Sequence, residues 1–172
     1  MIDPTKYPSY EVLTMGKDGT LISIMNPEDW SLFVGHMIAE AGGSEWYNTT
    51  LMQHIYNATG VGYYPNGITL NYLTSNEGPG NTIIIVSTEK KNLLLLAHEY
   101  GHVLGYEHTH PTEIEVMNPV AQMRHRDKHG LTSKFMDNFP EYYERFILPT
   151  QQSVDKAVTF GLLGAVAWGI LK

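Results

Sequence analysis

Three histidines and one glutamate near the middle of the chain have the residue types and spacing of a metal-dependent hydrolytic site. Residues 98–108 read His-Glu-Tyr-Gly-His-Val-Leu-Gly-Tyr-Glu-His. His98 and His102 are four residues apart, so in a helix both imidazoles leave the same face one turn apart. Gly105 can end the helix with a positive φ and turn the chain so that His108 becomes a third ligand. Three protein ligands leave the fourth position of a catalytic zinc ion open for water.

Glu99 supplies the remaining group that peptide-bond hydrolysis needs. It lies next to the expected ligand face, where a carboxylate can accept a proton from zinc-bound water and pass it to a leaving amine. The simpler alternative is an amphipathic helix that happens to carry several histidines. His-Glu-x-x-His alone is only moderately specific, but the extension through Gly105 and His108 makes the signal strong. The pattern therefore predicts a zinc-dependent endopeptidase with Glu99 as general base and acid.

The residues around this motif resemble the metzincin metalloproteases, and within them the matrixin-like members. Val116-Met117-Asn118-Pro119 follows His108 at the short separation typical of matrixins, and Met117 matches the methionine of the family's Met-turn. The stretch Gly-Pro-Gly-Asn-Thr at 78–82 is similar to the matrixin segment that leads into the substrate-aligning edge strand. The resemblance covers roughly residues 68–120. It implies an α+β, metzincin-like zincin fold: a small twisted mixed sheet over an active-site helix, and a short C-terminal subdomain. The chain's own C-terminal segment adds an expected hydrophobic tail helix to this fold.

The chain also departs from the matrixin pattern. Only residues 88–92 separate the strand expected at 82–87 from the active-site helix, so the segment that carries structural zinc and calcium ligands in matrixins is missing. We therefore expect one catalytic Zn²⁺ and no structural calcium. Ala121 stands where a tyrosine often forms the wall of the primary specificity pocket, which implies an altered pocket.

Hydrophobic periodicity predicts the elements that position these residues. An Asp-Gly turn indicates a hairpin over 11–15 and 20–24, and strands are expected at 68–73 and 82–87. We expect the strand 82–87 to pair with an extended substrate by strand addition. Helices are predicted where apolar residues recur at helical spacing and caps or glycines mark the ends: from 27 with Asn26 as cap, at 45–58, at 93–104, at 131–138, and from 140 to 147.

Three other polar residues near the motif could be taken for metal ligands. His110 lies two residues beyond His108 and is expected to be a solvent-facing loop residue. Glu113 and Glu115 could in principle replace a histidine as third ligand, but such glutamates normally come from a later helix. The charged run 124–129 contains two further histidines and is most simply a solvated loop.

Composition limits the classes of protein that the chain can belong to. With 172 residues, 42% hydrophobic and 17% charged, it can bury one core. The formal charge of −7 argues against a nucleic-acid partner, and the lack of cysteine excludes thiol catalysis and cysteine-ligated zinc. We expect a protease domain at 1–150 that acts on polypeptide substrates, with no nucleic-acid partner.

The segment 151–172 is expected to be a hydrophobic tail. Residues 157–171 carry no charge, but as a helix they would span only about 22 Å, less than a ~30 Å bilayer core. Small residues recur at every fourth position, which favours a membrane anchor over a helix packed on the domain. With no signal sequence ahead of it, a membrane anchor would leave the catalytic domain in the cytoplasm; secretion is the alternative. The alternative function is a non-catalytic, zinc-stabilised, membrane-associated protein.

Overall fold

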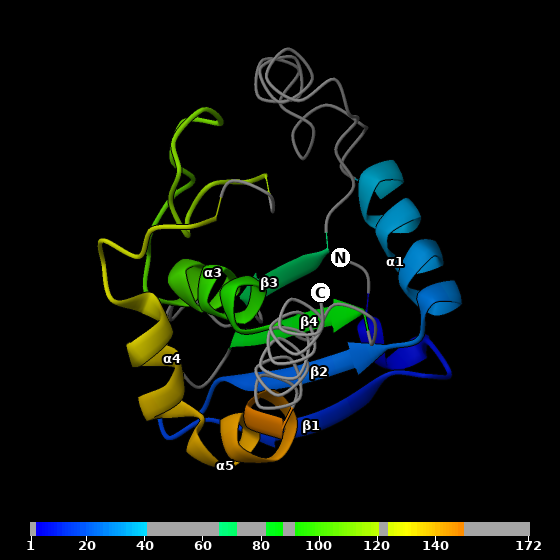
Figure 1. The fold of residues 1–172 in the computed structure, drawn as a ribbon. Coiled ribbons are helices and arrows are strands. Elements are labelled where there is room, and N and C mark those ends of the chain that lie inside the picture. Colours follow the sequence, from blue (N-terminus) through cyan, green and yellow to red (C-terminus); the bar gives the residue numbers. More distant parts are fainter. Residues whose placement is uncertain (1–2, 41–65, 72–81, 88–91, 121–123, 150–172) are drawn as a thin grey trace, which may run out of the picture. The chain divides into compact units, whose positions relative to one another are not determined.

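The computed structural model describes residues 3–40, 66–71, 82–87, 92–120 and 124–149 (Figure 1). The chain divides into two compact units, Met1–Phe139 and Pro140–Lys172. The first unit combines a four-stranded mixed sheet with α-helices, so the predicted α+β class is confirmed. The predicted helix at 45–58 lies outside the described residues.

The sheet contains the strands β1 (Glu11–Met15), β2 (Leu21–Met25), β3 (Gly67–Asn71) and β4 (Thr82–Ser87), in the order β1-β2-β4-β3. The predicted hairpin is confirmed as the antiparallel pair of β1 and β2. Strand β2 pairs with β4 in parallel, and β4 pairs with β3 in antiparallel orientation. The sheet is therefore mixed, as expected.

The position of β4 overturns one expectation. Its bounds agree with the predicted strand, but β2 occupies one side of it and β3 the other. Strand addition needs a free row of backbone donors and acceptors, so β4 cannot receive a substrate. The prediction that this strand pairs with substrate is wrong. Within the described residues β3 pairs with β4 alone and forms one edge of the sheet.

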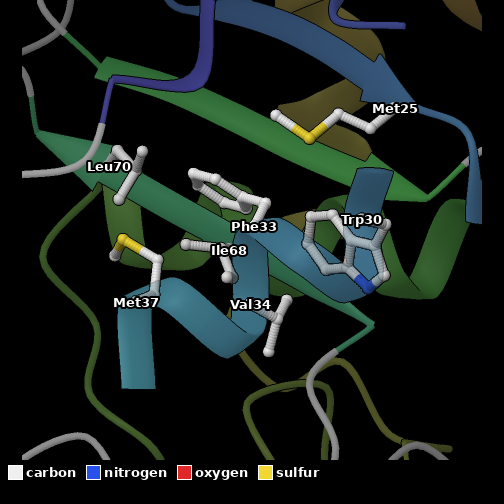
Figure 2. Packing of buried hydrophobic residues seen from close by; sticks show 7 residues of the cluster. All are labelled: Met25, Trp30, Phe33, Val34, Met37, Ile68 and Leu70. Atoms are coloured by element: carbon white, nitrogen blue, oxygen red, sulfur yellow. The ribbon is translucent and has the colours of Figure 1, made fainter. Parts of the chain in front are cut away.

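Helix α1 (Pro27–Glu40) covers one face of the sheet. Its predicted cap is confirmed, because the side chain of Asn26 accepts a hydrogen bond from the Asp29 amide at 2.8 Å. Four α1 side chains at helical spacing pack against one side chain from β2 and two from β3. These seven residues are Met25, Trp30, Phe33, Val34, Met37, Ile68 and Leu70 (Figure 2). They form a core that fixes β3 from one side.

Helix α3 (Leu93–Val103) packs against β3, β4 and α4. It begins at Asn92, whose side chain accepts a hydrogen bond from the Leu95 amide at 2.7 Å. Side chains alternate along a strand, so β3 presents Ile68 to the α1 core and Thr69 to the opposite face, where the Thr69 hydroxyl lies 2.9 Å from the Glu99 backbone oxygen. The sheet therefore lies between α1 and the helix that carries the histidine motif.

Helix α4 (Leu131–Asn138) confirms the predicted helix at 131–138. In the second unit, α5 (Pro140–Tyr142) continues into a π-helical turn at Tyr143–Ile147, where an amphipathic helix was predicted. None of the helices in the described part of the chain is long and apolar enough to cross a membrane. The expected tail at 151–172 lies outside the described residues, so its membrane association stays a prediction.

Asp127 should stabilise the protein at neutral pH by capping α4. Its carboxylate accepts hydrogen bonds from the Leu131 amide at 2.6 Å and the Thr132 amide at 2.8 Å. Burial acts to raise the pKa of Asp127, but a hydrogen bond from the Thr132 hydroxyl and the two amide hydrogen bonds outweigh it, so the pKa is lowered. A lowered folded-state pKa gives stability that is present above the unfolded-state pKa and is lost as the pH falls through the folded-state value.

We expect Asp127→Ala to reduce the free energy of unfolding by about 1 kcal/mol at pH 7. Urea denaturation of both proteins at pH 7 and again near pH 3 measures the effect. The difference in free energy of unfolding between the variant and the parent should be smaller at pH 3. Glu107→Ala, at an exposed carboxylate, is the control. The same difference in free energy of unfolding at both pH values would contradict the capping role.

Candidate functional site

The three predicted histidines meet at one point. His98 and His102 leave the same face of α3, and His108 approaches from the loop that follows the helix. The Nε2 atom of His108 lies 3.1 Å from Nε2 of His102 and 3.2 Å from Nε2 of His98. The arrangement is close enough for all three side chains to bind one metal ion.

Gly105 produces the turn that makes this possible. Its φ is +83°, in the left-handed region that favours glycine, and its amide donates to the His102 carbonyl at 3.0 Å. The next amide, of Tyr106, donates to the Gly101 carbonyl at 2.9 Å. The predicted left-handed helix end at Gly105 is confirmed, and it directs the chain back toward His108.

Two backbone carbonyls determine which ring nitrogen carries the proton in His98 and His102. Nδ1 of His98 lies 2.8 Å from the Val116 oxygen, and Nδ1 of His102 lies 2.9 Å from the Tyr106 oxygen. A carbonyl oxygen can only accept, so each Nδ1 must donate. In the neutral rings each of the two Nε2 atoms therefore carries a lone pair and no proton. Both lone pairs point toward the common centre.

The close approach of the three nitrogens is better explained by a shared metal ion than by hydrogen bonds among the rings. Nε2 of His108 can donate a proton to only one of its two neighbours, so at least one close nitrogen pair has no hydrogen between its members. Tetrahedral zinc with Zn–N bonds of about 2.0–2.1 Å places two ligand nitrogens about 3.3–3.4 Å apart. The distances of 3.1 and 3.2 Å are near this value. Imidazole nitrogen is also a preferred ligand of zinc and other late transition metals.

The electrostatic environment keeps the rings neutral. Burial lowers the pKa of His98 well below its usual value, and it lowers the pKa of His102. His108 is an exposed residue, but desolvation of its ring among the other histidines, together with the nearby His102, lowers its pKa to about 4. The positive charge of Arg124 acts in the same direction on all three groups. Neutral imidazole is the form that binds metal.

Glu99 is held by strand β3. Glu99 is only 4% exposed, and its Oε2 accepts a hydrogen bond from the Thr69 hydroxyl at 2.9 Å. A Cβ atom added at Gly67 would lie 2.7 Å from Oε1 of Glu99, so only glycine leaves room for this carboxylate. Burial raises the pKa of Glu99 to about 7, against the lowering effects of the Thr69 hydrogen bond and the Arg124 charge.

Met117 and its neighbours pack beneath the motif. Met117 is 1% exposed, and its sulfur lies so close to Gly101 of α3 that a side chain at Gly101 would collide with it. The carbonyl of the preceding residue, Val116, orients His98, as described above. The Met-turn segment named from the resemblance is thus in contact with the helix that carries two of the histidines.

Sequence reasoning missed Asn118, which organises the loop before it. This residue is fully buried, and its side-chain nitrogen donates to the Pro111 carbonyl at 3.0 Å while its Oδ1 accepts from the Val120 amide at 2.6 Å. Asparagine commonly bonds to nearby backbone in turns, and its place directly before a proline was the available signal. Asn118 therefore fixes the loop between His108 and Met117.

The expectation of a solvated loop at 124–129 is wrong for its first residue. Arg124 is only 5% exposed, and its Nε donates to the Asn118 carbonyl at 2.9 Å. His125 is exposed, as expected, whereas the ring of His129 packs against that of Tyr106 with centroids 4.6 Å apart. Hydrogen bonding to the loop below the motif explains why a charged residue is buried here.

The structure does not bring the other weighed ligands into the histidine cluster. His110 is exposed, as expected, and its ring nitrogen lies 2.8 Å from the Thr112 hydroxyl. Glu113 forms an ion pair with Lys128 at 3.6 Å. Glu115 is buried, and its Oε2 accepts from the Met117 amide at 3.1 Å.

Two features of the resemblance cannot be placed. Ala121, which would line the altered specificity pocket, lies outside the described residues, as does most of the stretch at 78–82. Comparison with known proteins adds no assignment: no family model matches the chain, and neither a curated protein nor a solved structure matches it significantly.

Proposed function

We propose that the protein is a zinc-dependent endopeptidase, with His98, His102 and His108 as the metal ligands. The observation that carries the proposal is the convergence of three imidazole Nε2 atoms. In two of the rings, Nδ1 donates to a backbone carbonyl, so Nε2 is unprotonated and can bind a metal ion. Three protein ligands leave one position for water, which is typical of catalytic rather than structural zinc sites.

Each residue of the site has a defined task in this proposal. A bound zinc ion would supply a Lewis acid that polarises the scissile carbonyl and makes water acidic. Glu99 would accept the proton of the attacking water and deliver it to the leaving amine. Thr69 and Gly67 would fix the Glu99 carboxylate, because one donates to it and the other leaves space for it.

Strand β3 takes over the role first expected of β4. We infer that an extended substrate pairs with the edge of β3 that has no partner strand among the described residues. This strand also contacts Glu99. Backbone pairing there would bring a polypeptide alongside the general base. The proposed substrates are unfolded or extended polypeptides, since pairing to a strand edge reads backbone rather than a particular side chain.

A metzincin-like fold of the matrixin type is part of the same proposal. Its support is local: the left-handed helix end at Gly105, the buried Met117 against α3, and the Val116 carbonyl that orients His98. These features involve residues of the motif itself. We propose one Zn²⁺ per chain and no structural calcium.

The proposal is tested by cleavage of an unfolded protein substrate before and after metal removal. Full-length protein treated with a strong chelator should lose cleavage, and a stoichiometric amount of Zn²⁺ should restore it. Cleavage that persists in the metal-free protein would contradict the mechanism. Zinc binding with higher thermal stability but no cleavage of any unfolded substrate would favour the non-catalytic, zinc-stabilised alternative.

A further inference from the structure

A pocket of about 500 Å³ opens at the C-terminal end of α3, and none of the three clustered histidines lines it. Its walls come from the hairpin turn before β2, the end of α3 and helix α4; they include Lys17, Tyr100, Leu104, Tyr106, Lys134 and Asp137. Tyr100 lies two residues from both His98 and His102, so it faces roughly the opposite side of α3. The volume falls in the range of small-ligand sites.

Two polar side chains that line this pocket, Tyr100 and Asn138, are hydrogen-bonded to Asp18. The Tyr100 hydroxyl donates to Asp18 Oδ2 at 2.9 Å, and the Asn138 side chain donates to Asp18 Oδ1 at 2.9 Å. The Lys17 amide also donates to the Asn138 carbonyl at 3.1 Å. The negative charge of Asp18 is therefore engaged within the protein and does not select a ligand.

Three charged side chains around the pocket remain available. Lys17, Lys134 and Asp137 are exposed, and in the described part of the chain none of them forms an ion pair. The Lys134 ammonium lies 5.4 Å from the centre of the Tyr106 ring and 3.4 Å from its hydroxyl. A chain with a net charge of −7 thus presents two cations and one anion at a single pocket.

Apolar side chains also line the pocket. Leu104 is 38% exposed, which is high for a leucine at the end of a buried helix. The Tyr100 ring packs edge-on against Phe139, with centroids 5.7 Å apart, so its position is fixed by the core. A ligand with an apolar body and charges of both signs would complement this surface.

We propose that this pocket binds a short zwitterionic peptide with apolar side chains. The carboxylate would lie between Lys17 and Lys134, the ammonium group at Asp137, and the side chains on Leu104 and Tyr106. Opposite charges at the two ends of the ligand would contact all three charged side chains, none of which forms an ion pair in the described part of the chain. A simple anion would contact only the two lysines. The inference does not depend on peptidase activity, because the pocket shares no side chain with the histidine cluster.

Isothermal titration of the full-length protein with the dipeptide Leu-Phe tests this assignment. We expect saturable binding that weakens at least about fivefold in Lys134→Ala and in Asp137→Asn. Lys128→Ala, at an exposed lysine outside the pocket, should bind as the parent does. N-acetyl-Leu-Phe-amide has the same apolar body without terminal charges and should also bind at least about fivefold more weakly.

A second arm separates this pocket from the metal site. His108→Gln should retain the dipeptide affinity of the parent protein, since His108 does not line the pocket. The assignment is overturned if the capped dipeptide binds as tightly as the free one, or if Lys134→Ala and Asp137→Asn change nothing. It is equally overturned if binding is lost in His108→Gln, or if no binding is detected up to about 10 mM.

Discussion

A protein carrying Glu99→Gln is expected to keep its metal and lose peptide cleavage, with kcat lower by roughly 10²–10⁴-fold. Glutamine has nearly the shape of glutamate, and its amide oxygen can still accept the hydrogen bond that Thr69 donates at 2.9 Å. It cannot take a proton from water at neutral pH. The loss should therefore appear in kcat, measured on an unfolded protein substrate, while the bound zinc per chain stays unchanged.

Two further variants sharpen this test. Thr69→Val leaves the carboxylate but removes its hydrogen bond, so kcat should fall by a smaller factor, about tenfold. Glu107→Gln changes an exposed glutamate at the end of the motif and should be silent. Full activity in Glu99→Gln would show that another group moves the proton. Loss of zinc in the same variant would instead give Glu99 a structural role.

Gly101→Ala is expected to destabilise the protein strongly. The added methyl group would collide with the Met117 sulfur and approach Leu131 Cδ1 to 3.1 Å. All three residues are buried, so relief requires Met117 to move or α3 to shift. Overpacking of this kind costs about 1–3 kcal/mol. Urea denaturation should show the loss, and zinc affinity should fall with it, since α3 carries two of the histidines.

Gly35→Ala is the matched control. Gly35 is an exposed glycine inside α1, and a Cβ atom there would meet nothing within 4 Å. Because alanine is the better helix former, this variant should gain about 0.5–1 kcal/mol. If the collision is the cause, Gly101→Ala should cost less stability in a Met117→Ala background than in the parent protein. Equal stability changes in Gly35→Ala and Gly101→Ala would contradict the close packing of Met117 on α3.

The features predicted correctly from the sequence depend on neighbours along the chain. The spacing of His98 and His102 predicts a shared helix face, and Gly105 predicts a left-handed end; both hold. The hairpin, the bounds of β4 and the helix at 131–138 also follow from local periodicity and turn residues. Each of these signals lies within a few residues of the feature that it predicts.

The features that escaped sequence analysis depend on contacts between distant segments. The neighbours of β4 are set by how the strands assemble, which a β-branched run does not specify. In the sequence, Thr69 is only one polar position of an alternating strand. It contacts Glu99, 30 residues away in the sequence, because β3 packs against α3. Arg124 lies in a charged run, and its burial follows from a hydrogen bond to Asn118.

The central claim is that three histidines hold one catalytic zinc ion, and X-ray absorption combined with metal analysis of the full-length protein tests it most directly. We predict one zinc per chain with three imidazole nitrogens at about 2.0–2.1 Å and one further light-atom ligand. His108→Gln should weaken zinc binding severely, whereas His110→Gln, two residues away, should leave stoichiometry and ligation unchanged. Less than one zinc per chain, fewer than three imidazole ligands, or equal effects of the two substitutions would contradict the account.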